Sequence, residues 1–157
     1  MSTHDKPVST PLTAEGRHAE LWSQLTQRGS ALIEAVARRT DTQPSRRRLL
    51  DYLDNEVIPH LRAEEEVLHT LARRAGERTV LAAMEIDHRA LLRQVEHIDR
   101  AATPFDAALA ARAVLLLFAL RMEKEEKVLL PALARAGVDT AELLEGHHEM
   151  VGTPPST

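Results

Sequence analysis

The sequence contains no cysteine among its 157 residues, and it is also poor in glycine and in aromatic residues. Without cysteine the chain has no disulfide, no thiolate zinc site, no iron–sulfur cluster and no cysteine nucleophile. Aromatic residues make up 3% of the chain and the net charge is −4, which does not fit a basic, base-stacking surface for nucleic acids. The six glycines form no glycine-rich loop of the kind that binds phosphates or dinucleotides.

Long hydrophobic runs are also absent. The longest uninterrupted apolar run covers residues 113–120, well below the roughly 18 residues that a transmembrane helix needs. The N-terminal stretch MSTHDKPVSTPLT lacks the charged and then apolar arrangement of a signal peptide. These features predict a single cytoplasmic domain that binds neither membranes nor nucleic acid, whereas the sequence does not indicate its oligomeric state.

What the sequence does contain is a pattern of long helices. Ala, Leu, Glu and Arg dominate, and apolar residues recur every three or four positions. Pro44 and Pro104 stand where helices commonly begin, and Gly76 and Gly137 stand where helices commonly end. The predicted helices cover about residues 13–39, 44–75, 77–102 and 103–136.

Short connections between these helices predict an all-α, up-down-up-down four-helix bundle over residues 13–136. Two prolines lie inside predicted helices, where proline removes a hydrogen bond and clashes with the preceding turn. Pro59 is expected to kink or break the second helix just before His60, and Pro131 is expected to bend the last turns of the fourth.

The ends of the chain lie outside this predicted bundle. Residues 1–12 are expected to form a flexible N-terminus. The sequence Asp139-Thr-Ala-Glu is a capping pattern that predicts a short fifth, C-terminal helix over residues 139–151. Residues 152–157, which contain two prolines, are expected to be a disordered tail.

An internal repeat relates the first helix to the third and the second to the fourth. Residues 18–25, HAELWSQL, match residues 88–95, HRALLRQV, and residues 60–68, HLRAEEEVL, match residues 121–129, RMEKEEKVL. The bundle is therefore expected to consist of two helical hairpins of one type, related by a pseudo-twofold axis.

The repeat pairs His18 with His88 and Glu64 with Glu125. His60 and Glu64 are four residues apart, so they share one helical face, which also carries apolar residues and therefore points to the core. A carboxylate on such a face is costly to bury unless it is paired or binds a cation. Imidazoles and carboxylates that converge from facing helices are the ligands of non-haem iron inside a bundle.

On these residues, and on the stretches IPHLRAEEEVL and EEKVLLPAL, the chain resembles the hemerythrin-like (HHE cation-binding) family over about residues 13–136. The resemblance implies a bundle around two irons bridged by carboxylates. Its pattern has a histidine on the first helix, His-x-x-x-Glu on the second and fourth, and one or two histidines on the third. Here the third helix supplies one, because Leu92 follows four residues after His88. Carried over to this chain, the implied metal ligands are His18, His60, Glu64, His88 and Glu125.

Arg121 stands where the family's fourth helix carries its histidine. A guanidinium does not ligate a metal, it repels cations, and this one could pair with Glu125 one turn away. Five of the six implied ligands remain, so the site could hold two irons, one or none. Candidate replacement ligands are Glu56 and Glu85, each one turn from a histidine of the set, and His148 in the predicted fifth helix.

Two classes of function follow from these residues. The first is a non-haem iron protein, with one or two irons, that binds or senses O2, NO or peroxide, or an enzyme that handles peroxide or NO. In that case Arg121 could donate a hydrogen bond to a bound peroxide. The second is a degenerate bundle without metal, in which an Arg121–Glu125–Glu64 ion network replaces the site and the protein is a structural or interaction module. Zinc in a partial site is a third, lesser alternative, and reversible oxygen carriage is least favoured because it needs the full histidine set.

Overall fold

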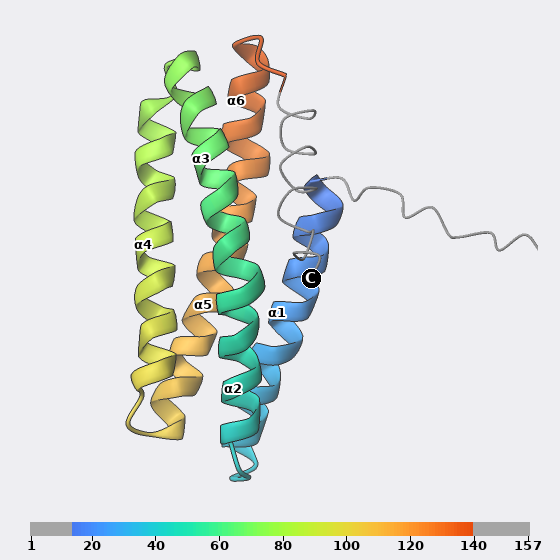
Figure 1. The fold of residues 1–157 in the computed structure, drawn as a ribbon, viewed down its shortest axis with the longest axis vertical. Helices are drawn as coiled ribbons and strands as arrows, with labels where there is room; N and C mark the ends of the chain where they lie inside the picture. The colour runs from blue at the N-terminus through green and yellow to red at the C-terminus, as the bar shows by residue number, and fades with distance from the viewer. Residues whose placement is uncertain (1–13, 140–157) are drawn as a thin grey trace, which may run out of the picture.

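The computed structural model describes residues 14–139, which form four long helical segments that run side by side (Figure 1). The first segment is a single helix and so is the third, whereas the second and fourth each contain a short π-helical stretch. In chain order the elements are α1 (Ala14–Ala37), α2 (Gln43–Tyr52), η1 (Leu53–Val57), α3 (Ile58–Ala75), α4 (Arg78–Arg100), α5 (Pro104–Lys124), η2 (Glu125–Leu129) and α6 (Leu130–Arg135). The predicted all-α, up-down-up-down bundle is confirmed.

The helix ends follow local backbone chemistry. The hydroxyl of Thr103 accepts a hydrogen bond of 3.1 Å from the backbone N–H of Asp106, which caps the start of α5. Gly76 and Gly137 follow α3 and α6 with φ angles of 81° and 78°, a left-handed conformation that glycine adopts without a steric penalty. The predicted flexible segment 1–12, the tail 152–157 and all but the first residue of the predicted fifth helix lie outside the described residues.

The two internal prolines do not break their helices. Each is preceded by a π-helical turn, in which the backbone N–H of Ile58 donates to Leu53 and that of Leu130 donates to Glu125, five residues back. Because proline has no N–H and its ring crowds the preceding turn, a wider turn at this point lets the helix continue. The expected disruption at Pro59 is therefore a local widening just before His60, and α2, η1 and α3 remain one continuous segment (Figure 1).

The buried core consists of two apolar clusters that follow one another along the bundle. On α3 the first cluster ends at Leu61 and the second begins at Leu68, and on α4 Met84 belongs to the second cluster and Leu91 to the first. Buried polar side chains lie at the level between them. We call this set the polar layer; it consists of His18, His60, Glu64, His88, Arg121 and Glu125.

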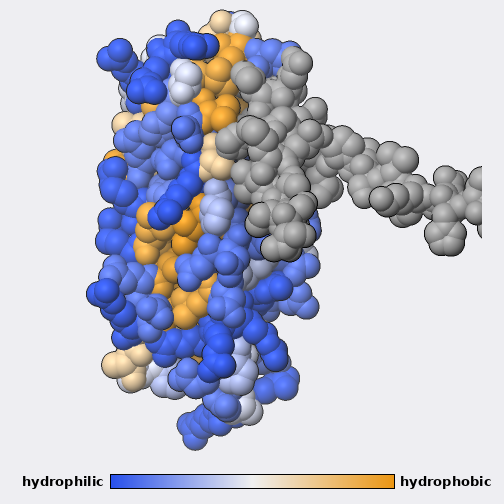
Figure 2. All heavy atoms as spheres, viewed as in Figure 1, coloured by the Kyte–Doolittle hydropathy of each residue, from blue (hydrophilic) through white to orange (hydrophobic). Residues whose placement is uncertain are grey.

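On the side where α4 faces the α2–α3 segment the packing is sparse, because α4 packs mainly against α5 and much less against α2 and α3. On this face the surface is mostly hydrophilic, with an apolar strip between α4 and the α2–α3 segment (Figure 2). A groove of about 320 Å³ opens there; its lining is Leu50, Asp54, Ile58, Leu92, Val95, Glu96 and Asp99. None of the described helices is both long and apolar enough to cross a membrane.

Helix α1 contacts α5 through an aromatic pair. The indole of Trp22, one helical turn after His18, stacks on the buried ring of Phe118, with the ring planes 3° apart and the centroids separated by 6.2 Å. Trp22 remains 39% exposed, whereas Phe118 is fully buried. The pair therefore extends from the core to the surface directly beside the polar layer.

Candidate metal centre

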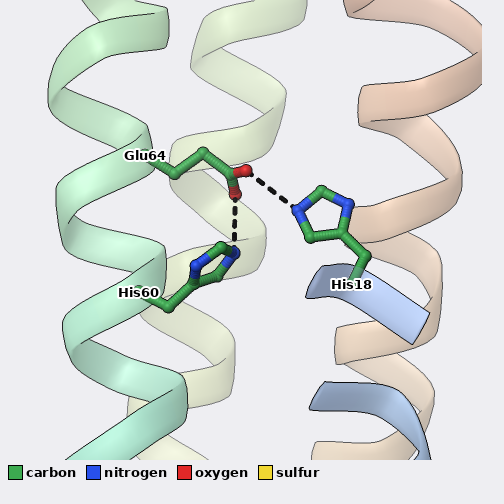
Figure 3. A group of neighbouring side chains, drawn as sticks. All are labelled: His18, His60 and Glu64. Carbon is green, nitrogen blue, oxygen red and sulfur yellow. Dashed lines mark hydrogen bonds and ion pairs between the residues drawn. The ribbon is translucent and has the colours of Figure 1, made fainter. Parts of the chain in front are cut away.

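Three side chains of the polar layer converge on one point of the core (Figure 3). His18 comes from α1, and His60 and Glu64 come from successive turns of α3. Nε2 of His18 lies 2.9 Å from Oε1 of Glu64, and Nε2 of His60 lies 3.6 Å from Oε2 of the same carboxylate. All three are at most 4% exposed. Each oxygen of Glu64 thus faces one imidazole nitrogen.

The separations between these atoms suit ligands of a single metal ion. Two ligands at right angles on bonds of about 2.1 Å are about 3 Å apart, and one donor atom from each of the three residues lies within 4.8 Å of the others. Two imidazoles and one carboxylate are the protein ligands of non-haem Fe(II) sites that keep open positions. The three residues therefore form a candidate metal centre.

Glu125 brings a second carboxylate to this centre. It is the first residue of the π-helical turn η2, it is 0% exposed, and its Oε1 lies 3.8 Å from Nε2 of His18. Neither of its oxygens accepts a hydrogen bond from a described residue. An ionised carboxylate at this position, with no donor in contact, would be costly, and a cation held by His18, His60 and Glu64 would remove that cost. The residues present therefore fit a bound metal.

The pKa values within the polar layer follow from burial and from the mutual charges of these groups. Burial would lower the pKa of His18, but its hydrogen bond with Glu64 and the nearby carboxylates raise it to about 9. Burial would raise the pKa of Glu64, but its hydrogen bond with His18 and the charges of His60, His18 and Arg121 lower it to about 2. Burial and the charge of Glu64 hold the pKa of Glu125 well above its ordinary value. Without a further cation, the layer does not favour two ionised carboxylates.

His88, the ligand expected from the third helix of the bundle, has a different partner. Its Nδ1 lies 3.1 Å from Oε2 of Glu65, whose other oxygen lies 3.4 Å from Nε2 of His69. Burial and the charge of Arg121 lower the pKa of His88, although Glu65 opposes this shift. The structure thus places His88 in the polar layer but outside the group formed by His18, His60 and Glu64.

Arg121 is almost fully buried, at 1% exposed. Its Nη1 donates a long hydrogen bond of 3.4 Å to the backbone carbonyl of Met84 on α4, while Nε and Nη2 have no hydrogen-bond partner among the described residues. No salt bridge of Arg121 with a carboxylate occurs within residues 14–139. The direct contacts to Glu64 and Glu125 that a metal-free ion network requires are therefore not formed.

The candidate replacement ligands face other partners. Glu56 is exposed and pairs with Arg17 at 3.0 Å, and Glu85 lies 3.4 Å from Nε2 of His69. Neither belongs to the group formed by His18, His60 and Glu64. His148 lies outside the described residues.

Two glutamates that the sequence analysis did not select lie next to candidate ligands. Glu65 contacts His88, and Oε1 of Glu126 lies 3.6 Å from Nδ1 of His18. Each directly follows an inward glutamate in the chain, at positions 64 and 125, and so lies at the edge of the buried face. That position is the sequence signal that could have identified them. Carboxylates beside the second nitrogen of a ligating histidine fix the orientation of its ring.

Comparison with known proteins agrees with this geometry. The family model of the hemerythrin HHE cation-binding domain matches residues 15–133, which include the whole polar layer. Comparisons with curated proteins and with solved structures gave no match. Since the matched region covers most of the chain, the protein belongs to the hemerythrin HHE cation-binding family.

Proposed function

We propose that this protein binds one non-haem iron at His18, His60 and Glu64, and that the iron binds a small molecule of the O2, NO or peroxide class. The observation that carries the proposal is the buried convergence of two imidazoles and a carboxylate on one point. Glu125, 3.8 Å from His18, would complete the protein ligands. The bound iron would supply an open coordination position, and the four side chains would hold it in a core closed to bulk water.

A single iron is favoured over two because the chain lacks the residues for a second. His88 faces Glu65 with Nδ1 3.1 Å from Oε2, Leu92 follows it on the same face, and Arg121 brings a permanent positive charge close to it. A second cation would lie close to that charge with only one imidazole to ligate it. The metal-free structural module is less well supported, because Arg121 forms no ion pair with Glu64 or Glu125 that would replace the metal. A cytoplasmic location stays a prediction.

The direct test is the iron content of tag-free protein, measured by mass spectrometry after expression with added iron and after anaerobic reconstitution with Fe(II). We expect one iron per chain, and addition of NO should produce the visible absorption and electron paramagnetic resonance of an iron nitrosyl. Folded protein that takes up no iron would overturn the proposal and favour the structural module. Two irons per chain would show that a second site is complete, and protein that retains only zinc would identify a different metal.

Metal affinity is expected to rise with pH across the neutral range. The pKa of His18 is raised to about 9, so this imidazole is protonated at neutral pH in the metal-free protein. Because a metal binds only the neutral ring, binding displaces a proton, and the affinity increases by up to about tenfold per pH unit below that pKa. The raised pKa of Glu125 acts in the same direction.

Competition with a chelator of known affinity, from about pH 6.5 to about pH 8.5, measures this dependence. The same titration in weakly buffered solution should show proton release on metal addition. An affinity that does not change with pH after correction for the chelator would show that His18 is not a ligand.

A further inference from the structure

Only one nitrogen of the Arg121 guanidinium forms a hydrogen bond with a described residue, and the edge formed by its other two nitrogens has no such partner. Nη1 is anchored to the carbonyl of Met84, whereas Nε and Nη2 donate to no described residue. Nε and Nη2 are the two nitrogens on one side of the planar group, and their N–H bonds point in parallel. This edge matches two oxygens of a planar anion, which it can bind through two charge-assisted hydrogen bonds.

Arg121 lies in the same buried layer as the candidate metal centre. Arg121 lies on α5 one turn before Glu125, and its anchor, Met84, lies one turn before His88 on α4. Arg121, Glu64 and Glu125 are each at most 1% exposed, so all three lie within the buried polar layer. The donor edge and the candidate centre therefore lie in one buried layer.

The buried guanidinium of Arg121 also lacks a counter-ion in direct contact. Glu64 and Glu125 would ligate the metal, and neither forms a salt bridge with Arg121 within the described residues. Asp87 pairs with Lys124 at 2.6 Å. A buried positive charge without a contacting counter-ion is unfavourable, and a monoanion at its open edge would compensate it.

We propose that the Nε–Nη2 edge of Arg121 is a subsite, beside the metal, for a small planar monoanion with two oxygen acceptors. This proposal rests on the proposed function. Nitrite, formate and bicarbonate have this shape and charge. Spherical halides present a single acceptor centre and do not fill both hydrogen bonds, so the subsite discriminates by geometry as well as by charge.

The test measures metal content and anion affinity separately in the same preparations. Zinc-loaded full-length protein, in which the metal is redox-inert, is titrated with sodium nitrite and with sodium formate by calorimetry, and with sodium chloride as the control anion. The variants are Arg121→Gln, which removes the charge, and Arg121→Lys, which keeps the charge but removes the planar edge. Arg112→Gln is the matched control, because Arg112 is an exposed arginine on the same helix.

We expect saturable nitrite and formate binding to the native protein and to Arg112→Gln. Both Arg121 variants should bind these anions at least about tenfold more weakly, because each loses at least one charge-assisted hydrogen bond. In protein labelled with ¹⁵N-arginine, a buried Nε–H resonance that is missing from Arg121→Lys should shift on nitrite addition.

Three results would overturn the inference. In the first, the Arg121 variants bind metal and nitrite as the native protein does, so that the anion contacts the metal alone and the proposed function stands. In the second, the metal-loaded native protein shows no saturable anion binding. In the third, the native protein binds no metal, and then both the proposed function and the proposed subsite are wrong.

Discussion

Replacement of His60 by alanine is expected to abolish iron binding and to leave the bundle folded. His60 supplies one of the two imidazoles that face Glu64, and it is 2% exposed. Loss of a partner outside the ligand set already weakens metal binding by about 10–100-fold, so loss of a ligand should weaken it by more than about a hundredfold. Glu64 keeps its hydrogen bond of 2.9 Å with His18, which preserves the contact between α3 and α1.

Iron content by mass spectrometry and the thermal transition by circular dichroism measure the two parts of this expectation. His97→Ala is the matched control, because His97 is an exposed histidine on α4 that contacts none of the candidate ligands. The control should retain the iron content of the native protein. Iron content in His60→Ala equal to that of the control would show that His60 is not a ligand.

The second large effect is expected from Arg121→His, which should raise the iron content from one per chain toward two. The change removes a buried positive charge and places an imidazole one turn before Glu125, on the helix packed against that of His88. Glu64 and Glu125 could then bridge two cations, since bridging carboxylates reduce the repulsion between them. The same variant should lose the anion affinity of the guanidinium edge.

Arg121→Gln separates the two contributions, because it removes the charge without supplying a ligand. If both variants gain iron equally, repulsion by Arg121, and not a missing imidazole, excludes the second ion. If Arg121→His gains none, the position does not face a second metal site, and the interpretation of Arg121 as a lost ligand is wrong. Both outcomes are read from the iron content of folded protein.

Most of the fold is predictable because its determinants are local. The apolar period, the cap at Thr103 and the glycine at position 76 each act within one or two helical turns, and the structure places the helices accordingly. The π-helical turns are different. The sequence marks only the prolines at positions 59 and 131, and whether a helix kinks, breaks or widens there depends on how the neighbouring helices pack.

The candidate site likewise has a part that the sequence predicts and a part that it does not. The spacing of His60 and Glu64 and the repeat that pairs His18 with His88 depend on helix geometry, so the sequence places them on inward faces. The partners of those side chains depend on rotamers and on the facing helix. One turn of helix permits Arg121 to pair with Glu125, but the structure directs its Nη1 to the carbonyl of Met84 on α4 instead. Only the packed bundle decides between such contacts.

The stacked pair of Trp22 and Phe118 has a practical consequence. The chain contains one tryptophan, so all of its indole emission comes from a ring that begins about 6 Å along the helix from His18. A paramagnetic or strongly absorbing ion at that histidine lies well inside the range at which it quenches an excited indole. Because the ring stacks on Phe118 and the residue is 39% exposed, the indole emission can report whether the site is occupied, and the native protein needs no added label.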